Sequence, residues 1–160
     1  MSTVAVTQFI EAPAIDLWRL LVDLPARADW LSTVDSVELL TPGRLAPGTS
    51  WRETRTRPDE DAQAEEFVVV EAVPLRRLVL SSSGIGVDYR ISWTLRTVRR
   101  RCRACTAVTV RQEARPTAPY GRVLALLLGG LAARAVEAAF RRDLADLARA
   151  AQPAAPAVAA

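Results

Sequence analysis

Glu53, Arg55 and Tyr89 are the residues of this sequence whose types and spacing could do chemistry on a small organic molecule. Glu53 and Arg55 alternate with Trp51 in a stretch typical of a β-strand, so a regular strand places all three side chains on one face. A carboxylate accepts a proton, a phenol can donate one, and a guanidinium can orient a carbonyl oxygen. We therefore take Glu53, Arg55 and Tyr89 as candidate catalytic residues.

Each of these residues also has a structural interpretation. Glu53 and Arg55 can pair with each other, or they can both lie at an exposed end of the sheet. Tyr89 can be a core tyrosine whose hydroxyl is hydrogen-bonded inside the protein.

The residue types that are missing narrow the chemistry further. The 160 residues include no histidine, and all 21 basic residues are arginines. A histidine general base and a Schiff-base lysine are therefore excluded, and the commonest ligand of transition metals is absent. We expect no metal and no cofactor.

Cys102 and Cys105 have the C-x-x-C spacing of redox and zinc motifs. They lie in a strand-turn-strand stretch with no helix after it, and no further Cys or His is present to complete a zinc site. Three interpretations stay open: an incidental pair in a hairpin loop, a disulfide within the loop, and a shared metal.

The composition is that of a soluble globular protein, with 50% hydrophobic and 24% charged residues. A net charge of +3 with scattered arginines does not indicate nucleic-acid binding, and the arginine run at residues 99–103 fits a solvated hairpin tip. The sequence shows no signal peptide, and its longest apolar stretch, residues 123–133, is about half of a membrane span. We expect a cytoplasmic monomer or homodimer with one domain over residues 1–150 and a disordered Ala/Pro tail over residues 151–160.

The elements that must position the candidate residues are mostly strands followed by one long helix. Alternation and turn residues predict a first strand at 3–10, short helices at 14–24 and 26–31, and strands at 34–40, 49–56, 66–73, 78–82, 87–98 and 106–113. A long helix is expected from about residue 118 to residue 150, with apolar residues at helical spacing: Val123, Leu124, Leu127, Leu131, Val136, Phe140, Leu144 and Leu147. Gly129 and Gly130 inside this helix predict a close approach to the sheet, a kink, or clearance for a ligand.

This order of elements resembles the helix-grip fold of the START-like (SRPBCC, Bet v 1-like) superfamily. The polyketide cyclase/dehydrase-type branch of bacterial single-domain proteins is the nearer likeness. The residues that carry the resemblance are those of segments 10–31, 47–56, 65–82 and 121–147, including the Ala12–Trp18 corner and the turn from Pro74 to Leu78. The resemblance implies an α+β fold in which a curved seven-stranded antiparallel sheet wraps round the C-terminal helix, with two short helices after the first strand.

The resemblance further implies a cavity between the sheet and the long helix. Strand alternation and the helix stripe give the candidate ligand-binding residues, each of which can equally be a core residue: Trp51, Glu53, Arg55, Phe67, Val69, Tyr89, Ile91, Trp93, Leu124, Leu127 and Leu131.

Two functions follow from such a cavity. The first is binding of a small hydrophobic ligand such as a lipid, an isoprenoid or a polyketide-like molecule, which requires only the cavity. The alternative is a polyketide cyclase or aromatase that folds a poly-β-ketone, which also requires a proton acceptor and donor. We favour binding over catalysis. A third possibility, a membrane-surface or partner-binding role for residues 123–131, competes with the need of the same stripe to cover the sheet.

Overall fold

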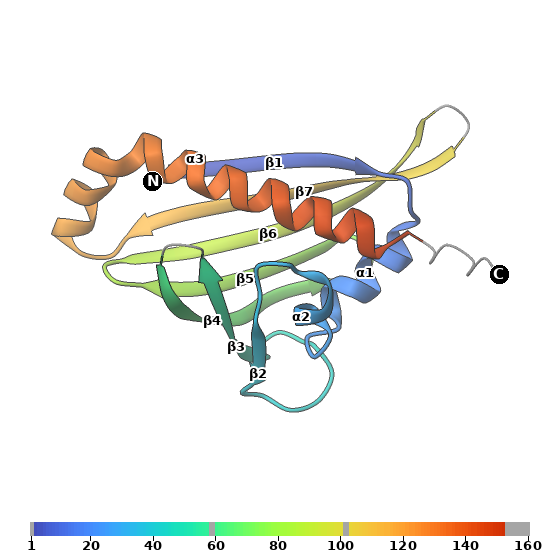
Figure 1. Cartoon of the computed structure of the whole chain (residues 1–160), viewed down its shortest axis with the longest axis horizontal. Helices are drawn as coiled ribbons and strands as arrows, with labels where there is room; N and C mark the ends of the chain where they lie inside the picture. Colours follow the sequence, from blue (N-terminus) through green and yellow to red (C-terminus); the bar gives the residue numbers. More distant parts are fainter. Residues whose placement is uncertain (1, 58–59, 101–102, 153–160) are drawn as a thin grey trace.

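The computed structural model describes residues 2–57, 60–100 and 103–152, without the side chains of residues 57, 60, 100, 103 and 121–129. These residues form a curved antiparallel sheet, two short helices at one end of it, and a long helix that runs across one of its faces (Figure 1). Cys102 and most of the tail that we expected to be disordered lie outside the described residues.

The sheet has seven strands in the order β1-β7-β6-β5-β4-β3-β2, and each neighbouring pair is antiparallel. The strands are β1 (Ser2–Ile10), β2 (Ser36–Leu39), β3 (Ser50–Arg57), β4 (Glu60–Val73), β5 (Arg77–Gly84), β6 (Val87–Arg100) and β7 (Arg103–Pro116). The helices are α1 (Ala14–Val22), α2 (Arg27–Trp30) and α3 (Pro119–Ala150). The predicted helix-grip architecture is therefore confirmed.

Several strands are longer than the sequence predicts, and β4 differs most, because it begins at Glu60 rather than at residue 66. Residues 60–65 include four polar residues and two alanines but no large apolar side chain. They are nevertheless paired with β3, as in Arg55↔Gln63 and Thr54↔Ala64. Pairing with a neighbouring strand thus extends β4 where side-chain pattern alone predicts a loop. Cys105 likewise lies buried in β7, which corrects its expected place in a hairpin loop.

One face of the sheet, the inner face, carries the apolar side chains and packs against α1 and α3. On β6, Ile91, Trp93 and Leu95 are buried whereas Arg90 and Arg96, which point the other way, are exposed. The period of two that was read from the sequence is thus realised. The core joins these residues to buried side chains of both helices: Leu17, Leu21, Phe140, Leu144 and Leu147.

The described side chains of helix α3 are buried at one end of the helix. The helix approaches β1 and β7 most closely, and among residues 119–120 and 130–150, whose side chains the structure describes, the buried ones lie at residues 140–147. Upstream, Leu131 is 71% exposed, and a Cβ added at Gly130 would meet nothing within 4 Å. The predicted apolar stripe therefore does not seat Leu131 on the sheet. Gly130 therefore does not lie close to the sheet, and no neighbouring atom needs the space that a side chain at this position would fill.

The start of α3 is braced by the turn between β5 and β6. The backbone N–H of Thr117 donates a hydrogen bond to the carbonyl of Gly86 at 2.9 Å. Gly86 has φ +72°, and a Cβ there would lie only 2.7 Å from the ring of Tyr120. Glycine is required at this position both by the backbone conformation and by the aromatic ring that lies on it.

Shortening one leucine in each part of α3 tests this anchoring. Leu144→Ala removes a fully buried side chain and should lower the free energy of unfolding by about 2–5 kcal/mol. Leu131→Ala, the matched control on the exposed part, should change it by less than about 0.5 kcal/mol. Urea unfolding followed by circular dichroism measures both values. Equal losses in the two variants would contradict an anchor confined to the last third of the helix.

Candidate functional site

Strands β3 and β4 carry three consecutive cross-strand pairs on the inner face. Trp51 pairs with Phe67, Glu53 with Glu65, and Arg55 with Gln63. The first pair is a stacked aromatic contact with ring centres 5.5 Å apart. The inner face therefore changes from apolar to charged within two rows of residues.

Glu53 lies at the centre of a buried ion network. Its Oε1 accepts hydrogen bonds from Arg27 Nε at 2.6 Å and from Trp51 Nε1 at 2.9 Å. Its Oε2 accepts from Arg55 Nε at 3.2 Å and from Arg55 Nη2 at 3.0 Å. The carboxylate is 0% exposed, so the interpretation that it lies at an exposed end of the sheet is wrong, and it does pair with Arg55. Because both oxygens already accept hydrogen bonds, Glu53 is a poor proton acceptor for a ligand, although its catalytic role stays a prediction.

The network continues from β3 to the loop after α2 and to α3. Arg55 Nη1 donates to Thr33 Oγ1 at 3.0 Å and lies 3.7 Å from Asp143 Oδ2. One turn further along α3, Asp146 Oδ2 accepts from the backbone N–H of Ser32 at 2.9 Å and from its hydroxyl at 2.7 Å. Charged and polar groups thus fasten the last third of α3 to the segment at residues 32–33.

Arg27 closes the network on its other side. Its side chain is almost fully buried, and its guanidinium lies 5.9 Å from the ring centre of Trp30 and 5.6 Å from that of Trp51. An arginine tolerates such burial when it is paired with a carboxylate and stacked on aromatic rings.

The pKa values of the network show which charges the fold favours. Burial opposes ionisation of Glu53, but the positive charges of Arg27 and Arg55 outweigh it and hold the pKa of Glu53 below its ordinary value. For Asp143 burial dominates, and it raises the pKa despite the attraction of the same arginines. Burial also disfavours the charged form of Arg55, yet Asp143 and Glu53 raise its pKa. The fold thus stabilises the charge of Glu53 and destabilises that of Asp143.

The structure places the residues predicted to line a cavity in different surroundings. Glu53 and Arg55 belong to the ion network, and the buried members of the core are Trp51, Phe67, Val69, Ile91 and Trp93. Tyr89 is half-buried on the same face, and Leu131 is exposed. The side chains of Leu124 and Leu127 lie outside the described residues.

Two polar residues of the inner face were missed by the sequence prediction. Ser82 is 4% exposed, and its hydroxyl donates a hydrogen bond to Glu65 Oε1 at 2.6 Å. Glu65 was missed because the predicted strand began one residue after it. Extending the alternation of Val69 and Phe67 by one step would have placed Glu65 on the inner face. Arg27, Asp143 and Asp146 were also missed, since periodicity favours solvent positions for charged residues.

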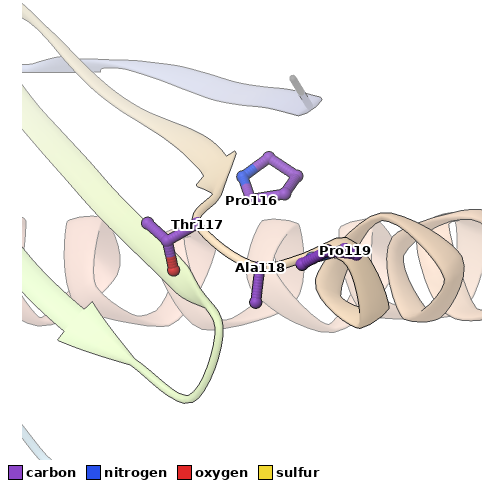
Figure 2. A pocket seen from close by; sticks show the side chains of 4 residues that line it. All are labelled: Pro116, Thr117, Ala118 and Pro119. Carbon is purple, nitrogen blue, oxygen red and sulfur yellow. The ribbon is translucent and has the colours of Figure 1, made fainter.

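The structure does not show a ligand-binding cavity beneath α3 among the residues it describes. A small pocket of about 230 Å³ does lie where β7 joins α3, and Figure 2 shows the four side chains that line it. They are Pro116, Thr117, Ala118 and Pro119, none of which is ionisable. None of these side chains can act as a general acid or a general base.

The described part of the chain contains no cluster of three or more His, Cys, Asp and Glu side chains arranged to hold a metal ion. Among its helices, none has the length and apolar character needed to cross a membrane.

A curved antiparallel sheet, a long C-terminal helix across its inner face and short helices at one end define a helix-grip protein. The chain belongs to the polyketide cyclase/dehydrase and lipid transport family, whose model matches residues 1–152.

Solved structures share this fold. The protein TTHA0849 from Thermus thermophilus is 20% identical, with a TM-score of 0.69 over 94% of this chain and 97% of that one. Protein CV1439 from Chromobacterium violaceum is 19% identical, with a TM-score of 0.65 over 96% and 99%. The di-domain ARO/CYC BexL from the BE-7585A biosynthetic pathway is 20% identical, with a TM-score of 0.69 over 96% of this chain and 51% of that one. No curated protein matches the chain.

Neutralising the two carboxylates separately should have opposite effects on stability. Glu53→Gln removes a charge that the fold favours and leaves buried arginines unpaired, so we expect a loss of about 3–5 kcal/mol at pH 7. Asp143→Asn removes a charge that burial disfavours, so the variant should be more stable than wild type at pH 7. Urea unfolding at pH 7 measures both differences.

The sign of each effect follows from the direction of the pKa shift. Stability from Glu53 is present above its ordinary pKa of 4.5 and is lost as pH falls, so the deficit of Glu53→Gln should shrink in acid. Stability from Asp143 is present below its ordinary pKa of 3.8 and is lost as pH rises through the raised value, so the advantage of Asp143→Asn should also shrink in acid. Destabilisation by Asp143→Asn at pH 7 would show that its attraction to Arg55 outweighs its burial.

Proposed function

We propose that this protein binds a small hydrophobic molecule between the inner face of the sheet and the first half of α3. Membership of a family described by polyketide cyclisation, dehydration and lipid transport supports this proposal, because its members act on or carry molecules of this kind. The observation that carries this proposal is that the side chains of the inner face become less buried towards the start of α3.

This decrease in burial can be followed from one row of the sheet to the next. In the row that contains Val6, the paired residues Val6, Val110, Trp93 and Leu78 are all at most 8% exposed. In the row two residues towards the start of α3, Leu80 and Ile91 are buried, but Gln112 and Val4 are only half-buried. In the following row, Ala114 and Tyr89 are half-buried as well, and only Ser82 is buried.

The helix above this region shows the same trend. Phe140, Leu144 and Leu147 are buried, Val136 is half-buried, and Leu131 is 71% exposed. Apolar side chains that are only partly covered on both the helix and the sheet favour an apolar ligand, since burial contributes about 25 cal/mol per Å². A ligand seated there completes the packing that the last third of α3 achieves by itself.

Cyclisation of a poly-β-ketone is the second candidate function. The fold is shared with the ARO/CYC protein BexL, and half-buried Tyr89 lies on the inner face with a phenol that can donate a proton. Incubation with a linear poly-β-ketone analogue should then give a cyclised aromatic product by absorbance and mass spectrometry, and Tyr89→Phe should lower its rate at least tenfold. A rate equal to that of a heat-denatured sample would remove this candidate.

Binding is tested with 1,6-diphenyl-1,3,5-hexatriene, an uncharged hydrocarbon whose fluorescence rises in apolar surroundings. We expect saturable binding with a dissociation constant below about 100 µM. Hydrogen exchange measured by mass spectrometry should slow at least tenfold in residues 119–135 of α3 and should stay unchanged in residues 140–150. This difference is expected because the second segment is already packed.

The same measurement can contradict the proposal in two ways. An absence of saturable binding would remove it outright. Binding with protection confined to residues outside α3 and the inner face would show that the probe occupies another surface. Native mass spectrometry of protein purified from its own host provides an independent check, since a bound natural ligand adds a fixed mass.

A further inference from the structure

Glu65 lies beside the buried ion network but has a different kind of partner. It pairs across the strands with Glu53 on the inner face, and its charge helps to raise the pKa of Arg55, but the hydrogen bond to its Oε1 comes from the neutral hydroxyl of Ser82. Glu53 is fully buried, whereas Glu65 is half-buried and so is partly open to the inner side of the sheet. The two neighbouring carboxylates thus differ, one being enclosed by the fold and the other accessible.

Ser82 holds Glu65 in a defined position. Its side chain is buried in the floor of the sheet, and its hydroxyl lies 2.6 Å from Glu65 Oε1. A carboxylate has about four acceptor positions, and one hydrogen bond from a neutral donor leaves capacity for a further donor. A fixed carboxylate at the edge of an apolar floor is suited to bind a hydroxyl group.

Tyr89 adds a second polar group on the other side of Ser82. Ser82 and Tyr89 are directly paired between β5 and β6. The ring of Tyr89 leans over Gly84, where an added Cβ would lie 3.0 Å from Cε2 of the ring. Glycine at this position therefore makes room for the ring, and Glu65, Ser82 and Tyr89 form one polar patch on the inner face.

The patch lies at the boundary of the apolar floor formed by Phe67, Leu80 and Ile91. The inner face is thus apolar with a polar patch at one end. A ligand that matches it is apolar with a polar group at one end. We propose that Glu65, positioned by Ser82, accepts a hydrogen bond from a neutral hydroxyl group at one end of the bound hydrophobic molecule. The proposal rests on the proposed binding function and narrows its ligand class to hydroxylated molecules, because a carboxylate on the ligand would be repelled by that of Glu65.

The test compares two small probes that differ by one hydroxyl, 2-methylnaphthalene and 2-naphthalenemethanol. Each displaces 1,6-diphenyl-1,3,5-hexatriene, and the ratio of their dissociation constants is measured in wild type and variants. The ratio removes effects that act on both probes equally, as in a double-mutant cycle. Glu65→Leu should lower the relative affinity for the alcohol by about tenfold or more, since a hydrogen bond to a charged group is lost.

Two further variants keep the result interpretable. Glu66→Leu is the matched control, because Glu66 is the adjacent carboxylate on the opposite face, where it pairs with Arg52 at the surface. It should leave the relative affinity within about twofold of wild type. Ser82→Ala should lower the relative affinity for the alcohol by about threefold while Glu65 is still present, because the carboxylate then loses its positioning hydrogen bond. Unchanged binding of 2-methylnaphthalene confirms that each variant is folded.

The outcomes separate the two proposals. If the diphenylhexatriene probe binds but Glu65→Leu leaves the relative affinity of the two naphthalenes unchanged, the hydroxyl site is wrong and hydrophobic binding stands. If the relative affinity falls equally in Glu65→Leu and Glu66→Leu, the effect is one of net charge, and the site is again wrong. If the diphenylhexatriene probe does not bind to wild type, the proposed function itself is wrong.

Discussion

The buried ion pairs of Glu53 with Arg27 and Arg55 are the interactions on which the packing of the helices against the sheet depends. The network joins three elements that are distant in sequence, because Arg27 belongs to α2, Glu53 and Arg55 to β3, and Asp143 to α3. Each charge in the network is tolerated only while its partners stay in place, since an unpaired buried charge is strongly destabilising. The network therefore fixes the last third of α3 relative to the sheet.

The difference in burial between the two ends of the described part of α3 relates the fold to the proposed binding. A helix packed tightly on the sheet along its whole length would leave no surface for a ligand, and a helix without buried side chains would not stay on the sheet. Here the polar latch of Asp146 on Ser32 and the buried leucines act at the same end. The inner face is most enclosed beneath that end and becomes more accessible towards Tyr89, where the polar patch of Glu65 and Ser82 begins.

The sequence predicts the fold better than it predicts the site, for identifiable physical reasons. Alternation and the turn residues indicate where strands begin and end, so the seven strands and the three helices were all predicted, although β4 begins at Glu60 and not at residue 66. Burial of charge could not be read in the same way. The charge of Asp143 and Asp146 predicts solvent exposure, and only the tertiary fold brings β3 and the loop at residues 32–33 against them. Glu65 was lost for a smaller reason, a strand boundary set one residue late, which a pairing partner on β3 corrects.

The way in which α3 is held at both ends also determines how a molecule reaches the inner face. The turn at Gly86 holds the beginning of the helix, the latch at Ser32 holds its end, and one long side lies against β1 and β7. Under the proposed function, a ligand would therefore reach the inner face from the remaining long side of α3, towards β3 and β4. Glu65 lies on β4 at that side, so its negative charge would disfavour the approach of anionic molecules.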